Sequence, residues 1–179
     1  VITEHSTIGL VVTTDGTVGD IPREEYEEAE ARVIQELQEI KKPFIVLLNS
    51  AFPEEPETKE LAQQMQAAYG VPVMPVNCLE LEEAEIRGIL SMVLYEFPIR
   101  EIKVEMPKWV SSLEKAHWLR SAVYGAIQQA ASGVSRMRGV SALPAQLESC
   151  EYVDSARAVS VDLGTGRARV ARRLKQDLF

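Results

Sequence analysis

Three apolar segments of this chain each end in small polar residues. The side chains of these residues could recognise a ligand. They are Thr13, Thr14 and Asp15 after the first segment, Asn49 and Ser50 after the second, and Asn77 and Cys78 after the third. Because parallel strands bind ligands at their carboxyl ends, we expect these residues to share one edge of a sheet. Their hydroxyls, amides and carboxylate would offer hydrogen bonds there. The sequence therefore predicts a binding edge.

Each group also has a plainer interpretation. Asn49 could be a turn-forming asparagine, and its position does not decide between that role and ligand recognition. For residues 13–15 we favour a polar strand end that leads into a capped helix over a lip beside a nucleotide. Cys78 and Cys150 show neither metal-ligand spacing nor a disulfide framework, so we expect packed thiols and no metal site.

Three repeats of strand, loop and helix position these groups. The run PFIVLLNS holds the middle strand, which is apolar at every position from Phe44 to Leu48 and therefore predicts a central parallel strand buried on both faces. The expected strands are residues 7–13, 44–48 and 71–76, and the expected helices are residues 20–40, 57–69 and 82–97. The first helix is expected to be capped by Asp20, to bury Tyr26, Ala29, Val33, Leu37 and Ile40, and to leave its acids 24–30 in solvent. This pattern predicts an α/β fold with right-handed connections.

The pattern of apolar and polar residues changes after Pro98. Residues 101–106 alternate between apolar and charged side chains, which predicts a strand with one wet face. About thirty residues then keep a seven-residue apolar repeat from Trp109 to Met137, broken only at Arg120. The repeat predicts one long amphipathic helix whose apolar seam needs a partner.

The chain is expected to return to strands after Gly139. Apolar residues alternate on both sides of residues 164–166, which predicts a β-hairpin and makes the second region α+β. The turn sequence DLGTG also resembles the phosphate loop of actin-like and sugar kinases. Those loops open an N-terminal domain, whereas this one joins two short strands late in the chain, and we therefore favour the hairpin.

Charge divides the chain at the same place. Residues 1–98 hold 19 acidic and 6 basic residues, net −13, and residues 99–179 hold 8 acidic and 13 basic residues, net +5. We therefore place a domain boundary after Pro98. The acidic half would repel phosphates, which argues against a nucleic-acid partner. The basic run RARVARRLK alternates as it would on the wet face of a strand, and we favour this over an anion site.

Composition is that of a soluble globular protein, with 46% apolar and 26% charged residues in a chain of 179. No run approaches the roughly 20 apolar residues of a membrane span, and the first residues lack the pattern of a signal peptide. We therefore expect a cytoplasmic protein. Because the chain opens on Val1 and not on methionine, we expect an internal fragment of a longer protein.

The order of the elements in residues 1–98 resembles the second half of a translation-factor-class P-loop GTPase domain, a three-layer fold with parallel strands. The match lies strand for strand in VVTTDGTVGD, KKPFIVLLNS and VPVMPVNC. In such domains the middle strand ends in Asn-Lys-x-Asp, whose aspartate accepts two hydrogen bonds from guanine. Here Asn49 is kept, while Ser50 and Phe52 replace the lysine and the aspartate, so the resemblance implies ATP and not GTP. It also implies that Asn77 and Cys78 lie in the second loop of the base site.

Over the whole chain the similarity is to the stage IV sporulation protein A family of endospore-forming bacteria. It is carried by HSTIGLVVTTDGTVGDIPREEYEEAEARVIQELQEIKKPFIVLLNS, YGVPVMPVNC, LYEFP, LEKAHWLR and SRMRGV, and runs from Val1 to about Gly166. The resemblance implies an ATPase that uses ATP and Mg²⁺, polymerises with itself on the mother-cell side of the forespore surface and forms the base layer of the spore coat. It also implies spore coat proteins and a small amphipathic forespore-membrane peptide as partners.

In this family the P-loop, the switch region and the metal-binding residues precede the point where this chain begins. No G-x-x-x-x-G-K-[ST] occurs in the chain. We therefore expect these 179 residues to contain no catalytic residue, to hold no cofactor and to hydrolyse no ATP alone, and we expect the free edge of the first strand to cause self-association. Two other functions stay open: a GTPase-like structural module that has lost catalysis, and an interaction fragment that uses the apolar seam.

Overall fold

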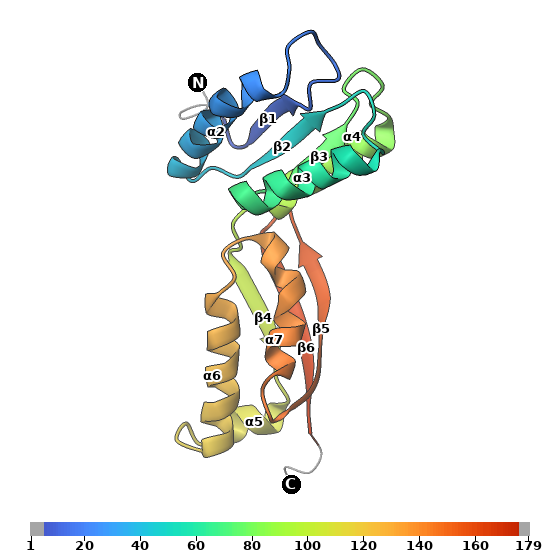
Figure 1. Ribbon diagram of the computed structural model, residues 1–179. Coiled ribbons are helices and arrows are strands. Elements are labelled where there is room, and N and C mark those ends of the chain that lie inside the picture. Colours follow the sequence, from blue (N-terminus) through green and yellow to red (C-terminus); the bar gives the residue numbers. More distant parts are fainter. Residues whose placement is uncertain (1–5, 176–179) are drawn as a thin grey trace. The chain divides into compact units, whose positions relative to one another are not determined.

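The fold was analysed in a computed structural model, which describes residues 6–175 (Figure 1). Residues 1–5, and residues 176–179 that follow the basic run, lie outside the described residues. The chain forms two compact units, Val1–Glu96 and Phe97–Phe179. Each unit has its own three-stranded sheet, and no strand pairing joins the two sheets within the described residues.

The first unit repeats strand and helix three times. Its elements are β1 (Gly9–Thr14), α2 (Glu24–Glu39), β2 (Phe44–Asn49), α3 (Pro56–Tyr69), β3 (Val73–Val76) and α4 (Glu83–Tyr95). The three strands are parallel in the order β1-β2-β3, and Asn49 lies opposite both Thr14 and Val76. The strand residues of β2 are buried from Phe44 to Leu48, as predicted for a central strand. The α/β class is therefore confirmed.

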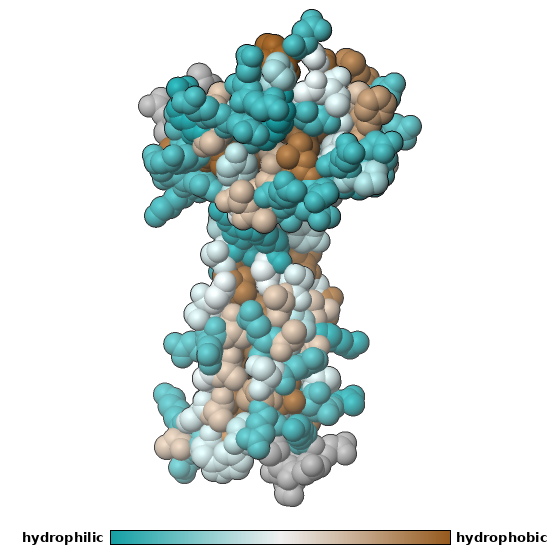
Figure 2. All heavy atoms as spheres, in the orientation of Figure 1, coloured by the Kyte–Doolittle hydropathy of each residue, from teal (hydrophilic) through white to brown (hydrophobic). Residues whose placement is uncertain are grey.

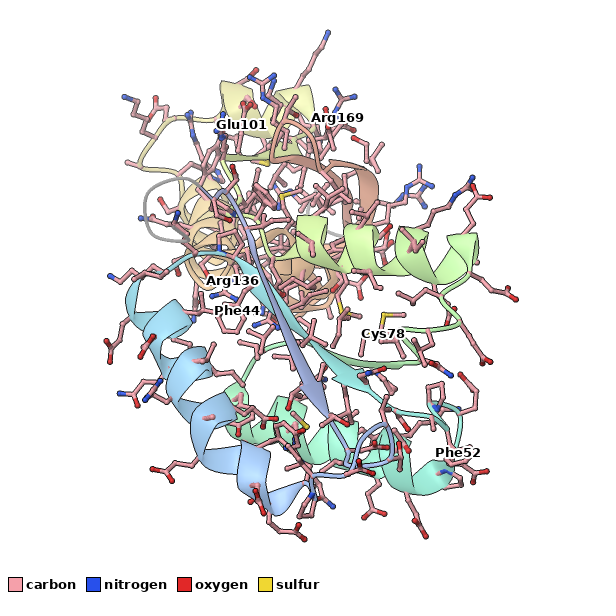
Figure 3. All side chains as sticks on the ribbon, turned by 90° about the horizontal axis from the view of Figure 1, so that it is seen from above. Phe44, Phe52, Cys78, Glu101, Arg136 and Arg169 are labelled. Carbon is pink, nitrogen blue, oxygen red and sulfur yellow. The ribbon has the colours of Figure 1, made fainter. Side chains whose placement is uncertain are left out.

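Helices cover both faces of this sheet (Figures 1 and 3). α2 and α3 pack on one face, where their apolar side chains form the main core with β1, β2 and β3. α4 lies on the other face, with Gly88 close enough to Met74 that an added Cβ would lie 3.5 Å from its methyl carbon. The helix α3 ends at Gly70, whose φ of 66° is a left-handed conformation that favours glycine.

The prediction for α2 was wrong at its start and on its buried face. The helix begins at Glu24 and not at Asp20. Its buried residues are Glu30, Ile34 and Leu37, of which Leu37 alone was predicted to be buried. Val33 and Ile40, which the apolar pattern places inside, are 38% and 36% exposed. Compared with the prediction, the buried face of α2 is rotated by about one residue. The reason is that the core contains a glutamate side chain, which a search for apolar residues cannot recognise.

The second unit holds a mixed sheet and several short helices. Its elements are β4 (Glu101–Glu105), α5 (Lys108–Ser112), α6 (Trp118–Ser132), the 3₁₀ helix η1 (Met137–Ala142), α7 (Leu143–Glu148), β5 (Val153–Asp162) and β6 (Arg167–Leu174). The strand order is β4-β6-β5, in which β4 and β6 are parallel and β5 and β6 are antiparallel. The predicted β-hairpin is therefore confirmed.

The turn of this hairpin is stabilised by hydrogen bonds between the Asp162 side chain and backbone amides of the turn itself. Asp162 Oδ1 accepts hydrogen bonds from the backbone N–H groups of Gly164 and Thr165, both at 3.1 Å. A hydrogen bond from the Thr165 side chain, together with these two backbone bonds, lowers the pKa of the Asp162 carboxyl. Gly166 follows with a φ of 69°. Because the carboxylate occupies two of the loop amides, the geometry favours the hairpin turn over a phosphate loop.

The single long helix predicted from Trp109 to Met137 was wrong. α5 ends at Ser112, and α6 begins at Trp118 with His117 as its cap, whose Nδ1 accepts a hydrogen bond from Leu119 N–H at 3.3 Å. Arg120 donates to the carbonyls of Ser111 and Leu113 and so satisfies the carbonyl end of α5. The one position that interrupted the apolar repeat is thus the residue that joins the two helices.

The strands expected after Gly139 begin at Val153, because η1 and α7, which were not predicted, occupy residues 137–148. Both helices contribute to the core over the sheet, with Val140, Leu143 and Leu147 packed against Val170. Within residues 6–175 no helix combines the length and the apolar character that a bilayer crossing requires.

Candidate functional site

The carboxyl ends of β2 and β3 are joined by hydrogen bonds from Asn49 and Ser50. The Cys78 backbone N–H donates to Asn49 Oδ1 at 2.9 Å. The Ser50 backbone N–H donates to the carbonyl of Val76 at 2.9 Å. Figure 3 shows Cys78 and Phe52 at this end of the sheet, away from Phe44 at the start of β2. The structure therefore brings the second and third predicted groups together at one edge.

The loop after β1 reaches the same edge. Asp15 Oδ1 accepts hydrogen bonds from the Thr17 backbone N–H at 2.9 Å and from its hydroxyl at 2.6 Å. The Thr17 hydroxyl oxygen in turn accepts a hydrogen bond from Ala51 N–H at 2.9 Å. Burial would raise the pKa of the Asp15 carboxyl, but hydrogen bonds from Ser50 and Thr17 outweigh it and leave the pKa lowered. Asp15 is therefore an ionised group that shapes the loop.

Thr13 and Thr14 point to different surroundings. Thr13 is buried and its hydroxyl donates to Glu30 Oε2 at 2.6 Å, under α2 and not at the open edge. The Thr14 hydroxyl oxygen accepts a hydrogen bond from Gly16 N–H at 3.1 Å. Both side chains serve the strand end and the loop that follows it.

Ser50 and Asn77 likewise have local partners. The Ser50 side chain is fully buried, and its hydroxyl oxygen accepts a hydrogen bond from Phe52 N–H at 2.9 Å. Asn77 Oδ1 accepts from Leu79 N–H at 3.1 Å, and its Nδ2 donates to Glu80 at 3.1 Å. Ser50, like Thr13, is therefore buried where a ligand cannot reach its side chain with the backbone in this position.

Asn49 keeps a donor for a ligand. With its Oδ1 held by Cys78, the Nδ2 group has no hydrogen-bond partner in residues 6–175. Exposed apolar side chains follow in both neighbouring loops, with Phe52 60% and Leu79 85% exposed. Burial raises the pKa of the Cys78 thiol, which is therefore neutral at pH 7. The edge can donate a hydrogen bond to a ring acceptor and stack against an aromatic group.

A buried ion pair on α2, beside the end of β1, stabilises this edge. The sequence analysis did not predict it. Arg23 and Glu30 meet through Nη1–Oε2 at 2.7 Å and Nη2–Oε1 at 2.9 Å. Tyr69 donates its hydroxyl to Glu30 at 2.9 Å, and Arg23 also donates to the Thr14 carbonyl at 2.9 Å. The network thus ties β1, α2 and α3 to the start of the edge loop.

The pKa shifts in this network have the directions that an ion pair requires. Burial would raise the pKa of Glu30, but hydrogen bonds from Arg23, Thr13 and Tyr69 outweigh it and the pKa is lowered. The hydrogen bond to Glu30 raises the pKa of Arg23. Burial, together with the bond to Glu30, raises the pKa of Tyr69 to about 12. The expectation that all acids of residues 24–30 lie in solvent was therefore wrong for Glu30.

The sequence did contain a signal for this pair. Arg23 and Glu30 are seven positions apart and continue the spacing of Ile34 and Leu37, so all four lie on one side of the helix. Two opposite charges on the same face as two core residues indicate a buried pair.

Within residues 6–175 no group of three or more His, Cys, Asp or Glu side chains is arranged to hold a metal ion. The described side chains at the edge present hydrogen-bonding groups, such as the Asn49 amide, and the exposed apolar groups of Phe52 and Leu79.

Two family models match the chain. Residues 1–98 match that of the stage IV sporulation protein A ATPase domain, and residues 99–179 match that of the stage IV sporulation protein A middle domain. No solved structure matches the chain.

Curated relatives agree. Stage IV sporulation protein A of Clostridioides difficile (strain 630) is 41% identical over 179 residues, which is all of this chain and 36% of that protein. The protein of the same name from Bacillus anthracis is 40% identical over the same length and share. That of Bacillus subtilis (strain 168) is 41% identical over 170 residues, or 95% of this chain and 35% of that protein. The chain spans only 36% of the length of the first two relatives. Because the family models cover residues 1–98 and 99–179, the chain belongs to the stage IV sporulation protein A family.

Proposed function

We propose that this chain is part of an ATP-hydrolysing, self-polymerising scaffold protein that forms the base layer of the spore coat during sporulation. The match of residues 1–98 to an ATPase domain supports the first part, and relatives named for a stage of sporulation support the last. The protein acts in the cytoplasm, on the mother-cell side of the forespore surface. Its partners there are further copies of itself, spore coat proteins and a small amphipathic membrane peptide.

The observation that carries the nucleotide part of this proposal is the 2.9 Å hydrogen bond from Cys78 N–H to Asn49 Oδ1. It orients the Asn49 amide so that its NH₂ group faces a ligand acceptor such as a ring nitrogen of a base. Phe52 lies where guanine recognition needs a carboxylate, and a phenyl ring accepts nothing from guanine N1 or N2. Adenine carries no proton on N1, so it leaves no N1 donor unpaired at this position. The edge therefore selects ATP.

The described residues fit the base of a nucleotide and not its phosphates. In P-loop proteins the grip on phosphate comes from loop amides, a lysine and Mg²⁺. The first unit, with a net charge of −13 over residues 1–98, would repel a triphosphate. We infer that the rest of the full-length protein supplies phosphate binding, Mg²⁺ and catalysis, while Asn49 and its neighbours choose the base.

A competition experiment on the full-length protein tests this. We expect ATP to displace a labelled ATP analogue at lower concentration than GTP does. Phe52→Asp should raise the affinity for GTP by about 10- to 100-fold, because a hydrogen bond to a charged group contributes about 1.5–3 kcal/mol. Phe52→Ala is the matched control, since it removes the ring without adding an acceptor, and should leave GTP binding weak. Equal affinity of the unaltered protein for both nucleotides would contradict the argument.

A structural module without catalysis is the second candidate, and the loss of two motif residues favours it. Ser50 is fully buried and engaged with Phe52 N–H, so it contributes nothing to a ligand. Hydrolysis of ATP by the full-length protein separates the two candidates. Hydrolysis that disappears when an upstream Walker A lysine is replaced by alanine supports the ATPase, and no hydrolysis by the unaltered protein supports the inactive module.

A further inference from the structure

The sheet of the second unit has one face that no helix of residues 97–175 covers. The helices of that unit pack on the other face, where Ala168 and Val170 of β6 are buried in the core (Figure 1). Side chains alternate along a strand, so the residues between them point outward. On β6 these are Arg167, Arg169, Ala171 and Arg173, and Arg157 of β5 lies opposite Ala171. We call Arg157, Arg167, Arg169 and Arg173 the arginine face.

Positive charge on this face is concentrated at one end. Arg167 pairs with Glu101 at 3.0 Å, and Arg169 pairs with Glu105 at 3.8 Å, both acids being on β4. Arg157 and Arg173 have no ion pair among the described residues. A hollow of about 370 Å³ lies at these two arginines. The end formed by β5 and β6 therefore offers two uncompensated guanidinium groups beside a depression.

The first unit carries a groove of the opposite charge. It has a volume of about 460 Å³ and lies between α2 and α3. Glu27 and Glu28 line it together with the side chains of Leu61, Met65 and Tyr69. Arg23 also lines it, but its charge is paired with Glu30. Figure 2 shows that hydrophilic side chains dominate the surface of α2 around it. The groove thus joins carboxylates to an apolar and aromatic wall, a combination that suits arginine, whose guanidinium pairs with carboxylates and stacks on aromatic rings.

We propose that the arginine face of one copy binds the groove between α2 and α3 of a second copy. This rests on the proposed self-polymerisation and names the contact that would carry it. The two surfaces lie on parts of the chain with opposite net charge, −13 for residues 1–98 and +5 for residues 99–179, so they attract one another. The two surfaces differ and lie on different units, so the contact is heterologous and each copy keeps one free surface of each kind. Such contacts build open chains when the rotation does not close a ring.

A second copy fits the arginine face better than an extended anionic surface does. Glu101 and Glu105 flank the arginines along β4, with half or nearly half of each side chain exposed. Both carboxylates are already paired with arginines, and Lys103 between them also pairs with Glu101 at 3.6 Å. A membrane or a nucleic acid, whose negative charge extends over a wide area, would therefore find unpaired positive charge at one end of the face and not along all of it. The two unpaired arginines, Arg157 and Arg173, instead match in number the two glutamates that line one groove, Glu27 and Glu28.

The test uses the full-length protein and two charge reversals. The first variant is Arg157→Glu with Arg173→Glu, and the second is Glu27→Arg with Glu28→Arg. With ATP, sedimentation should show at least about a tenfold rise in the concentration needed for polymer in each variant alone. An equal mixture should polymerise again, because native and reversed contacts then alternate along the chain. A contact within one copy would not be restored by mixing.

A matched control is Lys108→Glu with Lys115→Glu, which makes the same change of charge in the second unit outside the arginine face. It should polymerise like the unaltered protein, and circular dichroism should show every variant folded. Arg157→Gln with Arg173→Gln gives a milder change if the reversal prevents folding, and should weaken assembly less.

Unchanged assembly of either reversed variant, or a mixture that stays unassembled, overturns the proposed contact while the proposed function stands. Failure of the unaltered protein to polymerise with ATP overturns the proposed function, and the contact with it.

Discussion

Replacing Glu30 by alanine is expected to lower the free energy of unfolding of the first unit by about 3–5 kcal/mol. The Glu30 side chain is only 2% exposed and accepts four hydrogen bonds, two from Arg23 and one each from Thr13 and Tyr69. Alanine would leave the Arg23 guanidinium, 13% exposed, without its carboxylate. A buried and uncompensated charge has a cost of this size.

The size of the effect can be checked from the separate parts. Each hydrogen bond to a charged group contributes about 1.5–3 kcal/mol, but water and side-chain relaxation recover part of the loss, so the four contributions do not add. The double variant Arg23→Met with Glu30→Leu replaces the pair by apolar groups of similar volume. It should be less destabilised than Glu30→Ala, because no charge is left buried.

Urea unfolding followed by circular dichroism, with amide hydrogen exchange of β2, measures this change. Both tryptophans of the chain, Trp109 and Trp118, lie in the second unit, so their fluorescence reports that unit separately. Glu28→Ala is the matched control on the exposed side of α2 and should change the free energy by less than about 0.5 kcal/mol. A loss below about 1 kcal/mol for Glu30→Ala would refute the view that this pair holds the unit together.

Three further results are expected. The pKa of Glu30 is lowered in the fold from its ordinary 4.5, so its contribution to the free energy of unfolding is present above pH 4.5 and is lost as the pH falls through the lowered value. The difference in stability between the unaltered chain and Glu30→Gln should therefore disappear in that pH range. Gly166→Ala should lose about 1–2 kcal/mol in thermal unfolding, since φ is 69° and a Cβ would lie 3.3 Å from the Pro98 carbonyl, whereas Gly164→Ala should lose less. Arg172→Met should keep or raise the melting temperature, because burial lowers the pKa of Arg172 and its Nε and Nη1 have no partner in the described part of the chain. A clear loss there would contradict this.

The sequence pattern predicted those elements in which burial and apolar character coincide. β2 is apolar and buried from Phe44 to Leu48, and the hairpin strands β5 and β6 lie where alternation and glycines indicate them. The pattern failed where a polar side chain determines the structure. Because Glu30 is buried, the buried face of α2 differs from the predicted one. Arg120 donates to a carbonyl at the end of α5, where the predicted long helix is interrupted.

The candidate site was predictable to the level of its loops. The motif match placed Asn49 and Cys78 beside each other, and a hydrogen bond joins them. The match could not show that Ser50 is buried, or that Thr13 turns away toward α2, since both depend on side-chain direction after the strands have paired. Thr17, whose hydroxyl links two loops, was missed because threonine in a loop has no distinctive pattern.

The parallel pairing of β4 with β6 also determines when the second unit can form during synthesis. Glu101 lies opposite Arg167, 66 positions further along the chain, and β6 is the strand that joins β4 to β5. At roughly 5–20 residues per second, β4 therefore leaves the ribosome about 3–13 s before its partner. During that interval β1, β2 and β3 of the first unit can already pair while β4 has no partner strand. Nascent chains arrested before Arg167 should therefore be cleaved by protease after Pro98 and resist it before Glu96.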